Sequence, residues 1–226
     1  MEKSTKWVYI YPAFERFWHW AQMVLIFFLA FTGFEIHGTY KFFGFESAVT
    51  FHIYTAYSLL VLTLFAIFWH LATGEWRNYI PTPKKVFAYV NFYLVGIFKN
   101  APHPTNRTFI SKLNPLQKVV YFGLKIVIIP LIIITGILYL YYRFETNAGI
   151  ASLNIVNLQV IAYLHTLGAY LILAFIIAHI YLTTTGHTIF SNINAMLTGY
   201  EELEMEDGQL EKEIIEKHKI MENNKE

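Results

Sequence analysis

Long apolar runs, separated by short polar segments, dominate the pattern of hydrophobic and polar positions along this chain. Four of them reach the length of about 20 residues that an α-helix needs to cross a bilayer. They are Phe17–Ile36, Val49–Leu71, Lys118–Leu140 and Val160–Thr184. The pattern predicts an all-α integral membrane protein with a four-transmembrane-helix bundle.

The long connection between the second and third runs contains a shorter apolar segment. Residues 84–99 begin and end with lysine and enclose mainly aliphatic and aromatic side chains. This segment is too short to span a bilayer, and its pattern predicts an amphipathic helix lying in the membrane interface. A loop packed on the bundle is the alternative interpretation.

The composition changes after Gly199. Residues 201–226 contain ten acidic residues and four lysines. We therefore divide the chain into a transmembrane domain, residues 1–199, and an acidic cytoplasmic tail, residues 200–226, whose pattern is compatible with a helix.

Basic residues are distributed unevenly between the connections, and this predicts the orientation. The two short connections contain Lys41 and Arg143 as their basic residues. The long connection contains six basic residues and a single acidic residue, Glu75. The six are Arg77, Lys84, Lys85, Lys99, Arg107 and Lys112. Because Lys and Arg favour the cytoplasmic side, we expect both termini and the long connection in the cytoplasm. In a bacterium this describes a multi-pass protein of the inner membrane.

The overall composition narrows the possible cofactors. The 226 residues are 55% hydrophobic and 15% charged, whereas soluble domains average about 25% charged residues. The absence of cysteine excludes disulfides, iron–sulfur clusters and thiolate ligation of haem. Histidines are left as the main candidate metal ligands.

Five histidines fall within the predicted spans, where ionisable residues are costly and usually functional. They are His19, His52, His70, His165 and His179. The last two stand 14 residues apart on one span, so they lie about 21 Å apart on nearly one helix face. This spacing places one histidine in each leaflet.

His165 and His179 each have a possible partner histidine at the same depth in the membrane. His52 enters from the outside with the second span and pairs with His165, while His19 pairs with His179 at the inner level. Two neutral imidazoles on opposite faces of a macrocycle are the axial ligands of a b-type haem, so the pattern predicts two haems b. His70 is an alternative inner ligand in place of His19; otherwise it would hydrogen-bond a haem propionate or a quinone.

Other residues have two interpretations each. Arg16, one turn before His19, suits a propionate or anchors the inner end of the span. Lys125, seven residues into the third span, suits the inner propionates or a quinone oxygen, or extends to the membrane surface. Gly33 and Gly136 allow a flat ring or a neighbouring helix to approach closely.

Two other classes of function compete with the haem interpretation. Intramembrane histidines also bind zinc, copper or iron in transition-metal transporters. That class predicts further Asp, Glu or Met in the spans, which are almost absent. A non-redox membrane scaffold leaves the depth-matched histidine pairs unexplained.

Several short segments carry a resemblance to a known family. They are Arg16–Trp20, His52, the pair His165 and His179, Thr73–Pro81, Asn114–Lys118 and Thr183–His187. These segments resemble the bacterial cytochrome b membrane subunits of formate dehydrogenase, nickel–iron hydrogenase and thiosulfate reductase.

The resemblance implies a di-haem electron-transfer subunit rather than a stand-alone enzyme. Such a subunit passes electrons between the quinone pool, menaquinone or ubiquinone, and a partner redox enzyme or cytochrome subunit on the periplasmic side. The implied partners are thus the lipid bilayer, a quinone and a redox subunit, and not nucleic acid.

The resemblance also implies a quinone site before the third span. Asn114 matches an asparagine that helps to bind a menaquinone analogue in the family, and Gln117 matches a nearby glutamine, with Leu116 at a family glycine. We therefore expect Asn114, Gln117 and His70 to line the quinone site. Asn before Pro115 also suits a helix N-cap, which would use the side-chain oxygen and leave the amide donor free.

Overall fold

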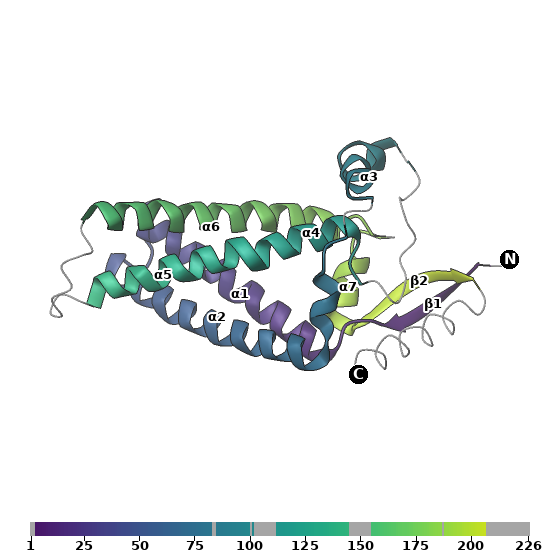
Figure 1. Ribbon diagram of the computed structural model, residues 1–226, viewed down its shortest axis with the longest axis horizontal. Coiled ribbons are helices and arrows are strands. Elements are labelled where there is room, and N and C mark those ends of the chain that lie inside the picture. Colours follow the sequence, from purple (N-terminus) through teal and green to yellow (C-terminus); the bar gives the residue numbers. More distant parts are fainter. Residues whose placement is uncertain are drawn as a thin grey trace. The chain divides into compact units, whose positions relative to one another are not determined.

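The computed structural model describes residues 3–82, 85–99, 101, 112–144, 155–186 and 188–206. The long helices are α1 (Ala13–Ile36), α2 (Phe45–Thr73) and α6 (Ile155–Thr183). A further long helix is continuous through α4 (Pro115–Gly123), a π-helical turn (Leu124–Ile128) and α5 (Ile129–Phe144) (Figure 1).

Four helices of the described chain are long and apolar enough to cross a membrane, which confirms the four predicted spans. The spanning segments are Ala13–Ile36, Phe45–Thr73, Pro115–Tyr141 and Leu158–Thr183. Only 6–11% of the residues in their most apolar windows are buried inside the protein. The outward faces of these helices therefore suit contact with lipid rather than water.

The chain divides into two compact units. The bundle unit consists of Phe17–Ala72 and Gly123–Tyr181, and the strand unit consists of Met1–Arg16, Thr73–Phe122 and Leu182–Glu226. The bundle unit contains the histidine-bearing parts of the spans, and the strand unit contains the two β-strands.

A buried carboxylate closes the connection between α1 and α2. Glu35 is only 4% exposed, and its Oε1 accepts backbone N–H groups from Phe42, Phe43 and Gly44 at 2.7, 2.7 and 2.8 Å. Gly44 has φ +84°, a left-handed conformation that glycine adopts without strain. The acid near the end of the first span thus has a structural role in ordering the turn.

A two-stranded antiparallel sheet joins the two ends of the described chain. β1 (Lys3–Tyr9) pairs with β2 (Tyr200–Glu206), with Tyr9 opposite Tyr200. Residues 200–206 of the acidic tail are therefore a strand rather than a helix, while residues 207–226 lie outside the described residues. The predicted domain boundary falls at the start of this strand.

Gly199 makes the turn into β2 possible. It follows α7 (Ser191–Thr198) at φ +89°, and its carbonyl accepts the N–H groups of Ile10 and Tyr11 at 2.9 and 3.1 Å. A Cβ at this position would lie 2.5 Å from the Tyr9 ring and 2.8 Å from the Tyr11 carbonyl oxygen. Only glycine fits this approach, since any larger residue adds backbone strain to a collision.

The helix predicted in the long connection is confirmed from Val86 to Lys99. It consists of α3 (Val86–Asn91), a π-helical turn (Phe92–Gly96) and a short 3₁₀ turn (Ile97–Lys99). Large apolar side chains are exposed along it, with Phe87 at 88% and Phe98 at 75%. These exposures favour the predicted position in the membrane interface.

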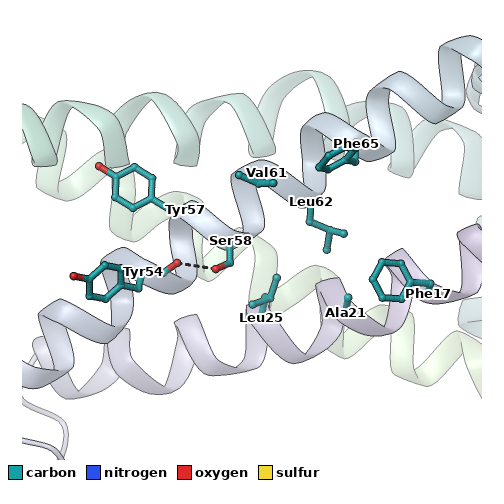
Figure 2. Close-up of a pocket in the computed structure, with 9 residues that line it drawn as sticks. All are labelled: Phe17, Ala21, Leu25, Tyr54, Tyr57, Ser58, Val61, Leu62 and Phe65. Carbon is teal, nitrogen blue, oxygen red and sulfur yellow. Dashed lines mark hydrogen bonds between the residues drawn. The ribbon is translucent and has the colours of Figure 1, made fainter.

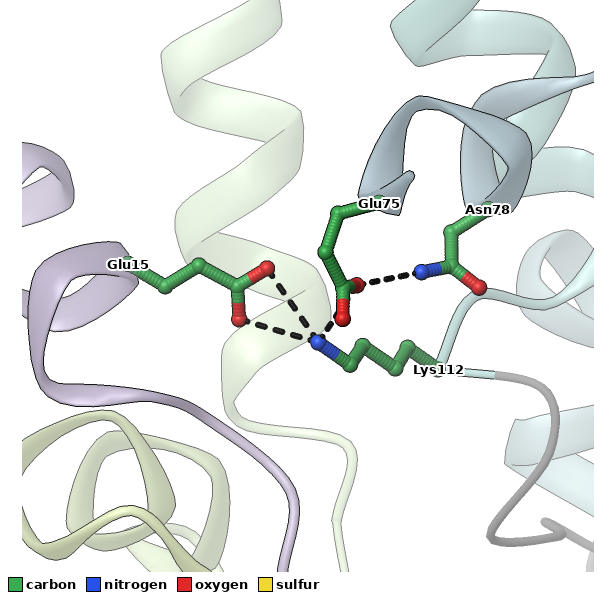
Figure 3. Close-up of polar contacts among 4 residues, drawn as sticks. All are labelled: Glu15, Glu75, Asn78 and Lys112. Carbon is green, nitrogen blue, oxygen red and sulfur yellow. Dashed lines mark hydrogen bonds and ion pairs between the residues drawn. The ribbon is translucent and has the colours of Figure 1, made fainter. Parts of the chain in front are cut away.

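A buried ion-pair cluster links three segments of the strand unit (Figure 3). Lys112 Nζ lies 3.1 Å from Glu15 Oε2 and 2.7 Å from Glu75 Oε2, and the Asn78 amide donates to the same Glu75 oxygen at 2.6 Å. The Lys112 and Glu15 side chains are each 8% exposed. Burial, together with Glu15, raises the pKa of the neighbouring Tyr79, so its phenol stays protonated.

Lys112→Met should destabilise the strand unit, because it leaves two largely buried carboxylates without their counter-charge. Breaking a buried ion pair from one side costs about 3–5 kcal/mol. Thermal unfolding of the purified protein in detergent should show a lower Tm than the native chain.

Lys112→Arg is the matched control, since it keeps the positive charge and should retain most of the stability. Adding Glu15→Gln to Lys112→Met should recover part of the loss by removing one uncompensated charge. An unchanged Tm in Lys112→Met would show that the cluster does not stabilise the fold.

Candidate cofactor site

Two histidine pairs form inside the bundle unit, with the partners predicted from depth. The ring centroids of His52 on α2 and His165 on α6 are 6.4 Å apart. Those of His19 on α1 and His179 on α6 are 6.1 Å apart. Helix α6 thus contributes one histidine to each pair, and its helical rise separates the two by about 21 Å.

Each histidine of the His52–His165 pair contacts a threonine from a neighbouring helix. Thr32 Oγ1 on α1 lies 2.9 Å from His52 Nδ1, and Thr135 Oγ1 on α5 lies 2.9 Å from His165 Nδ1. Sequence reasoning missed both threonines. The available signal was the dipeptide Thr-Gly, which occurs in the first span and again in the third.

The glycines of these dipeptides lie against the same imidazoles. A Cβ at Gly33 would stand 3.6 Å from His52 Cε1, and one at Gly136 would stand 3.4 Å from His165 Cε1. The groups nearest to these two positions are thus the imidazoles of the neighbouring helices.

The His19–His179 pair has a different environment. The Phe175 ring stacks on His179 with centroids 5.6 Å apart. His19 Nδ1 and Trp18 Nε1 are both buried, and neither has a hydrogen-bond partner among the described residues. Two polar atoms thus accompany this pair in an apolar setting.

His70 lies near the same end of the bundle unit but packs differently. It is 7% exposed, its Nδ1 lies 2.6 Å from the Ala66 carbonyl oxygen, and its ring meets Trp18 edge-on at 5.7 Å. The ring that faces His179 is that of His19. This arrangement favours His19 over His70 as the partner of His179.

Asn114 and Gln117 form a reciprocal capping box at the start of α4, in the strand unit. Asn114 Oδ1 accepts the Gln117 backbone N–H at 2.8 Å, and Gln117 Oε1 accepts the Asn114 N–H at 2.9 Å. The N-cap is thus confirmed. The expectation that the Asn114 amide stays free is wrong, because Nδ2 donates to the Tyr93 hydroxyl at 3.3 Å.

The two basic candidates occupy different surroundings. Arg16 Nη1 donates to the Leu197 carbonyl at the end of α7 with a donor–acceptor distance of 2.5 Å, which satisfies a helix C-terminus. Lys125 is half-buried within the π-helical turn of the third span. Turns of this kind are frequent at functional sites.

A groove of the bundle unit is lined mainly by apolar side chains of α1 and α2 (Figure 2). It has a volume of about 670 Å³ and is lined by residues of α1 and α2, among them Ala21, Tyr54 and Val61. Val61 is nine residues from His52, so the two side chains point to opposite faces of α2. The groove therefore faces the lipid side, and its apolar lining suits a hydrocarbon chain.

Comparison with known proteins assigns the chain to a family. Residues 10–199 match the family described as prokaryotic cytochrome b561. The chain is also 30% identical over 200 residues to the Escherichia coli (strain K12) protein named "Putative cytochrome YdhU", covering 85% of this chain and 74% of that protein. The chain belongs to the prokaryotic cytochrome b561 family, and it is a bacterial membrane cytochrome b of electron transfer that binds haem b.

The histidine pairs fit the cofactor that this family implies. A metal–imidazole bond is about 2 Å long and the ring centroid lies about 1 Å beyond the nitrogen, so two axial imidazoles on one iron stand about 6 Å apart. The observed separations of 6.1 and 6.4 Å agree with this value. Each pair is therefore spaced to provide the two imidazoles that such a group would need.

The described residues contain no cluster of three or more His, Cys, Asp or Glu side chains suited to a bare metal ion. Family membership, together with the paired geometry, favours the cytochrome interpretation over the transition-metal transporter.

Proposed function

We propose that this protein holds two haems b, one between His52 and His165 and one between His19 and His179. The observation that carries this proposal is the separation of the two imidazoles in each pair, which suits axial ligation in both cases. One histidine of each pair belongs to α6. Bound haem would supply one-electron redox chemistry at two depths of the bilayer. The histidines hold each group and exclude other axial ligands, while the surrounding apolar helices keep water away.

Removal of single ligands should divide the four histidines into two sets. His52→Ala and His165→Ala should each leave one haem per chain with the same remaining spectrum. His19→Ala and His179→Ala should leave the other haem, because each variant breaks only its own pair. The native chain should contain two haems by a pyridine haemochrome assay.

His70→Ala is the matched control, since it removes an intramembrane histidine that packs on Trp18 rather than on His179. It should retain both haems. Loss of a haem in His70→Ala, together with two haems in His19→Ala, would instead assign the ligand role to His70.

The proposed topology places both termini and the long connection in the cytoplasm of a bacterium, with the spans in the inner membrane. The excess of lysine and arginine in the long connection supports this orientation. It assigns the His19–His179 pair to the cytoplasmic leaflet and the His52–His165 pair to the periplasmic leaflet.

The proposed reaction is electron exchange between a quinone and a redox partner subunit on the periplasmic side. The resemblance to cytochrome b subunits of membrane-bound oxidoreductases supports this pairing of partners. Within this proposal the quinone binds at the start of the third span, where Asn114 and Gln117 offer amide groups. An amide N–H donates to a quinone carbonyl without bringing charge into the membrane.

The capping box changes how these amides would serve a quinone. Gln117 Oε1 and Asn114 Oδ1 already accept backbone N–H groups. The side-chain amide N–H groups would therefore be the ones that bind the quinone, by donating to it. The Asn114 amide would exchange the long 3.3 Å hydrogen bond to Tyr93 for one to the quinone. Tyr93 is thus the partner that the Asn114 amide would leave on binding a quinone, a contact with no signal in the sequence.

Asn114→Asp tests the quinone proposal, because it keeps the capping oxygen and removes the amide donor. It should retain both haems while slowing their reduction by a quinol analogue several-fold, since one hydrogen bond contributes about 1 kcal/mol. Stopped-flow absorbance of the haems measures this rate.

Tyr93→Phe is the control for this measurement, because it removes the present partner of the amide and leaves the amide itself. In this variant the quinol analogue should reduce the haems at the native rate or faster. Equal slowing in both variants would mean that Asn114 acts only by ordering Tyr93, and native rates in both would move the quinone site elsewhere.

A further inference from the structure

The two threonines beside the His52–His165 pair repeat one arrangement on two helices. Thr32 is 0% exposed and Thr135 is 3% exposed, and each has its Oγ1 at 2.9 Å from a histidine Nδ1. Each is followed by a glycine at which an added Cβ would reach van der Waals contact with the same imidazole. The same geometry thus occurs once between α1 and α2 and once between α5 and α6.

The direction of these hydrogen bonds follows from counting protons. Thr32 Oγ1 lies 2.9 Å from the Phe28 carbonyl oxygen, and Thr135 Oγ1 lies 2.7 Å from the Leu131 carbonyl oxygen. A carbonyl only accepts, so each hydroxyl proton points to its own helix backbone. The hydroxyl oxygen then accepts from the histidine, which places the imidazole proton on Nδ1.

This tautomer leaves the Nε2 lone pair of each histidine available. In a neutral imidazole one nitrogen donates and the other accepts, and the hydrogen bond of the first fixes the role of the second. Because the threonines are buried, water does not compete for the Nδ1 proton. Both histidines of the pair are therefore oriented for ligation through Nε2.

The second histidine pair lacks an equivalent arrangement at His19. Its Nδ1 is buried without a hydrogen-bond partner among the described residues. Among the described residues, His19 Nδ1 therefore lacks the neighbouring acceptor that Nδ1 of His52 and of His165 has.

We propose that Thr32 and Thr135 are positioning residues that fix His52 and His165 in the Nδ1–H tautomer and lower the reduction potential of the haem held there. This rests on the proposed function, in which that pair ligates a haem. An acceptor on the distal N–H makes an imidazole a more basic ligand. A more basic ligand stabilises the oxidised iron relative to the reduced iron, which lowers the potential.

Thr32→Val and Thr135→Val test this inference, since each removes the hydroxyl and keeps the branched shape. Loss of the hydrogen-bond partner of a metal-bound histidine weakens ligation about 10-fold or more. A tenfold preferential loss for the oxidised form corresponds to a rise of about 59 mV in a one-electron potential. Potentiometric titration should show this rise in one haem while the other keeps its native potential.

Two sets of controls separate positioning from general packing. Thr32→Ser and Thr135→Ser keep the hydroxyl and should restore the native potential. Thr63→Val removes a hydroxyl that is back-bonded in the same way, to the Leu59 carbonyl at 2.7 Å, on a helix that also carries a ligand. It should leave both potentials unchanged.

If a valine variant binds haem poorly, its haem content replaces the potential as the measurement that tests the inference. Loss of one haem, restored by serine, supports the positioning role, and the low-spin electron paramagnetic resonance signal of that haem should be the one that disappears. Loss of both haems, equal shifts of both potentials, or native potentials in both valine variants would overturn the inference. A native chain with fewer than two haems would contradict the proposed function instead.

Discussion

Hydrocarbon offers no hydrogen-bond partner, so every polar group within a spanning helix must be satisfied inside the protein. Glu35 Oε1 meets this requirement through three backbone N–H groups, and Thr32 and Thr135 meet it through the carbonyl one turn earlier on their own helix. Histidine is harder to satisfy in this way, because one neutral ring carries both a donor and an acceptor. In the bundle unit, Nδ1 of His52 and Nδ1 of His165 each find a threonine of a neighbouring helix as partner.

The four spans contribute unequally to this arrangement. Helix α6 carries a histidine of each pair, and α1 presents His19 toward α6 and Thr32 toward α2, two positions about 140° apart around the helix. The third span has no histidine, yet Thr135 contacts His165. The His52–His165 pair is thus held by more helices than the two that supply its histidines.

The sequence predicted the features that depend on local pattern and on depth. The four spans follow from apolar length, and the pairing of His52 with His165 follows from counting residues along helices of known direction. The sheet was missed because Lys3–Tyr9 and Tyr200–Glu206 lie far apart in the chain and their register has no local signal. Thr32 and Thr135 were missed because a threonine in a membrane helix ordinarily bonds its own backbone, and these do so as well.

A hydroxyl acceptor suits a ligand within the bilayer better than a carboxylate does. Carboxylates are common partners of metal-bound histidines in water-exposed proteins, where they raise ligand basicity strongly. At the centre of a membrane a charged side chain costs about 2.5–3.5 kcal/mol or more. Thr32 and Thr135 accept the same proton while remaining neutral, because each passes its own proton to a helix carbonyl. On the proposed function, the chain thereby distinguishes two otherwise similar sites along α6 with neutral hydroxyl partners at His52 and His165.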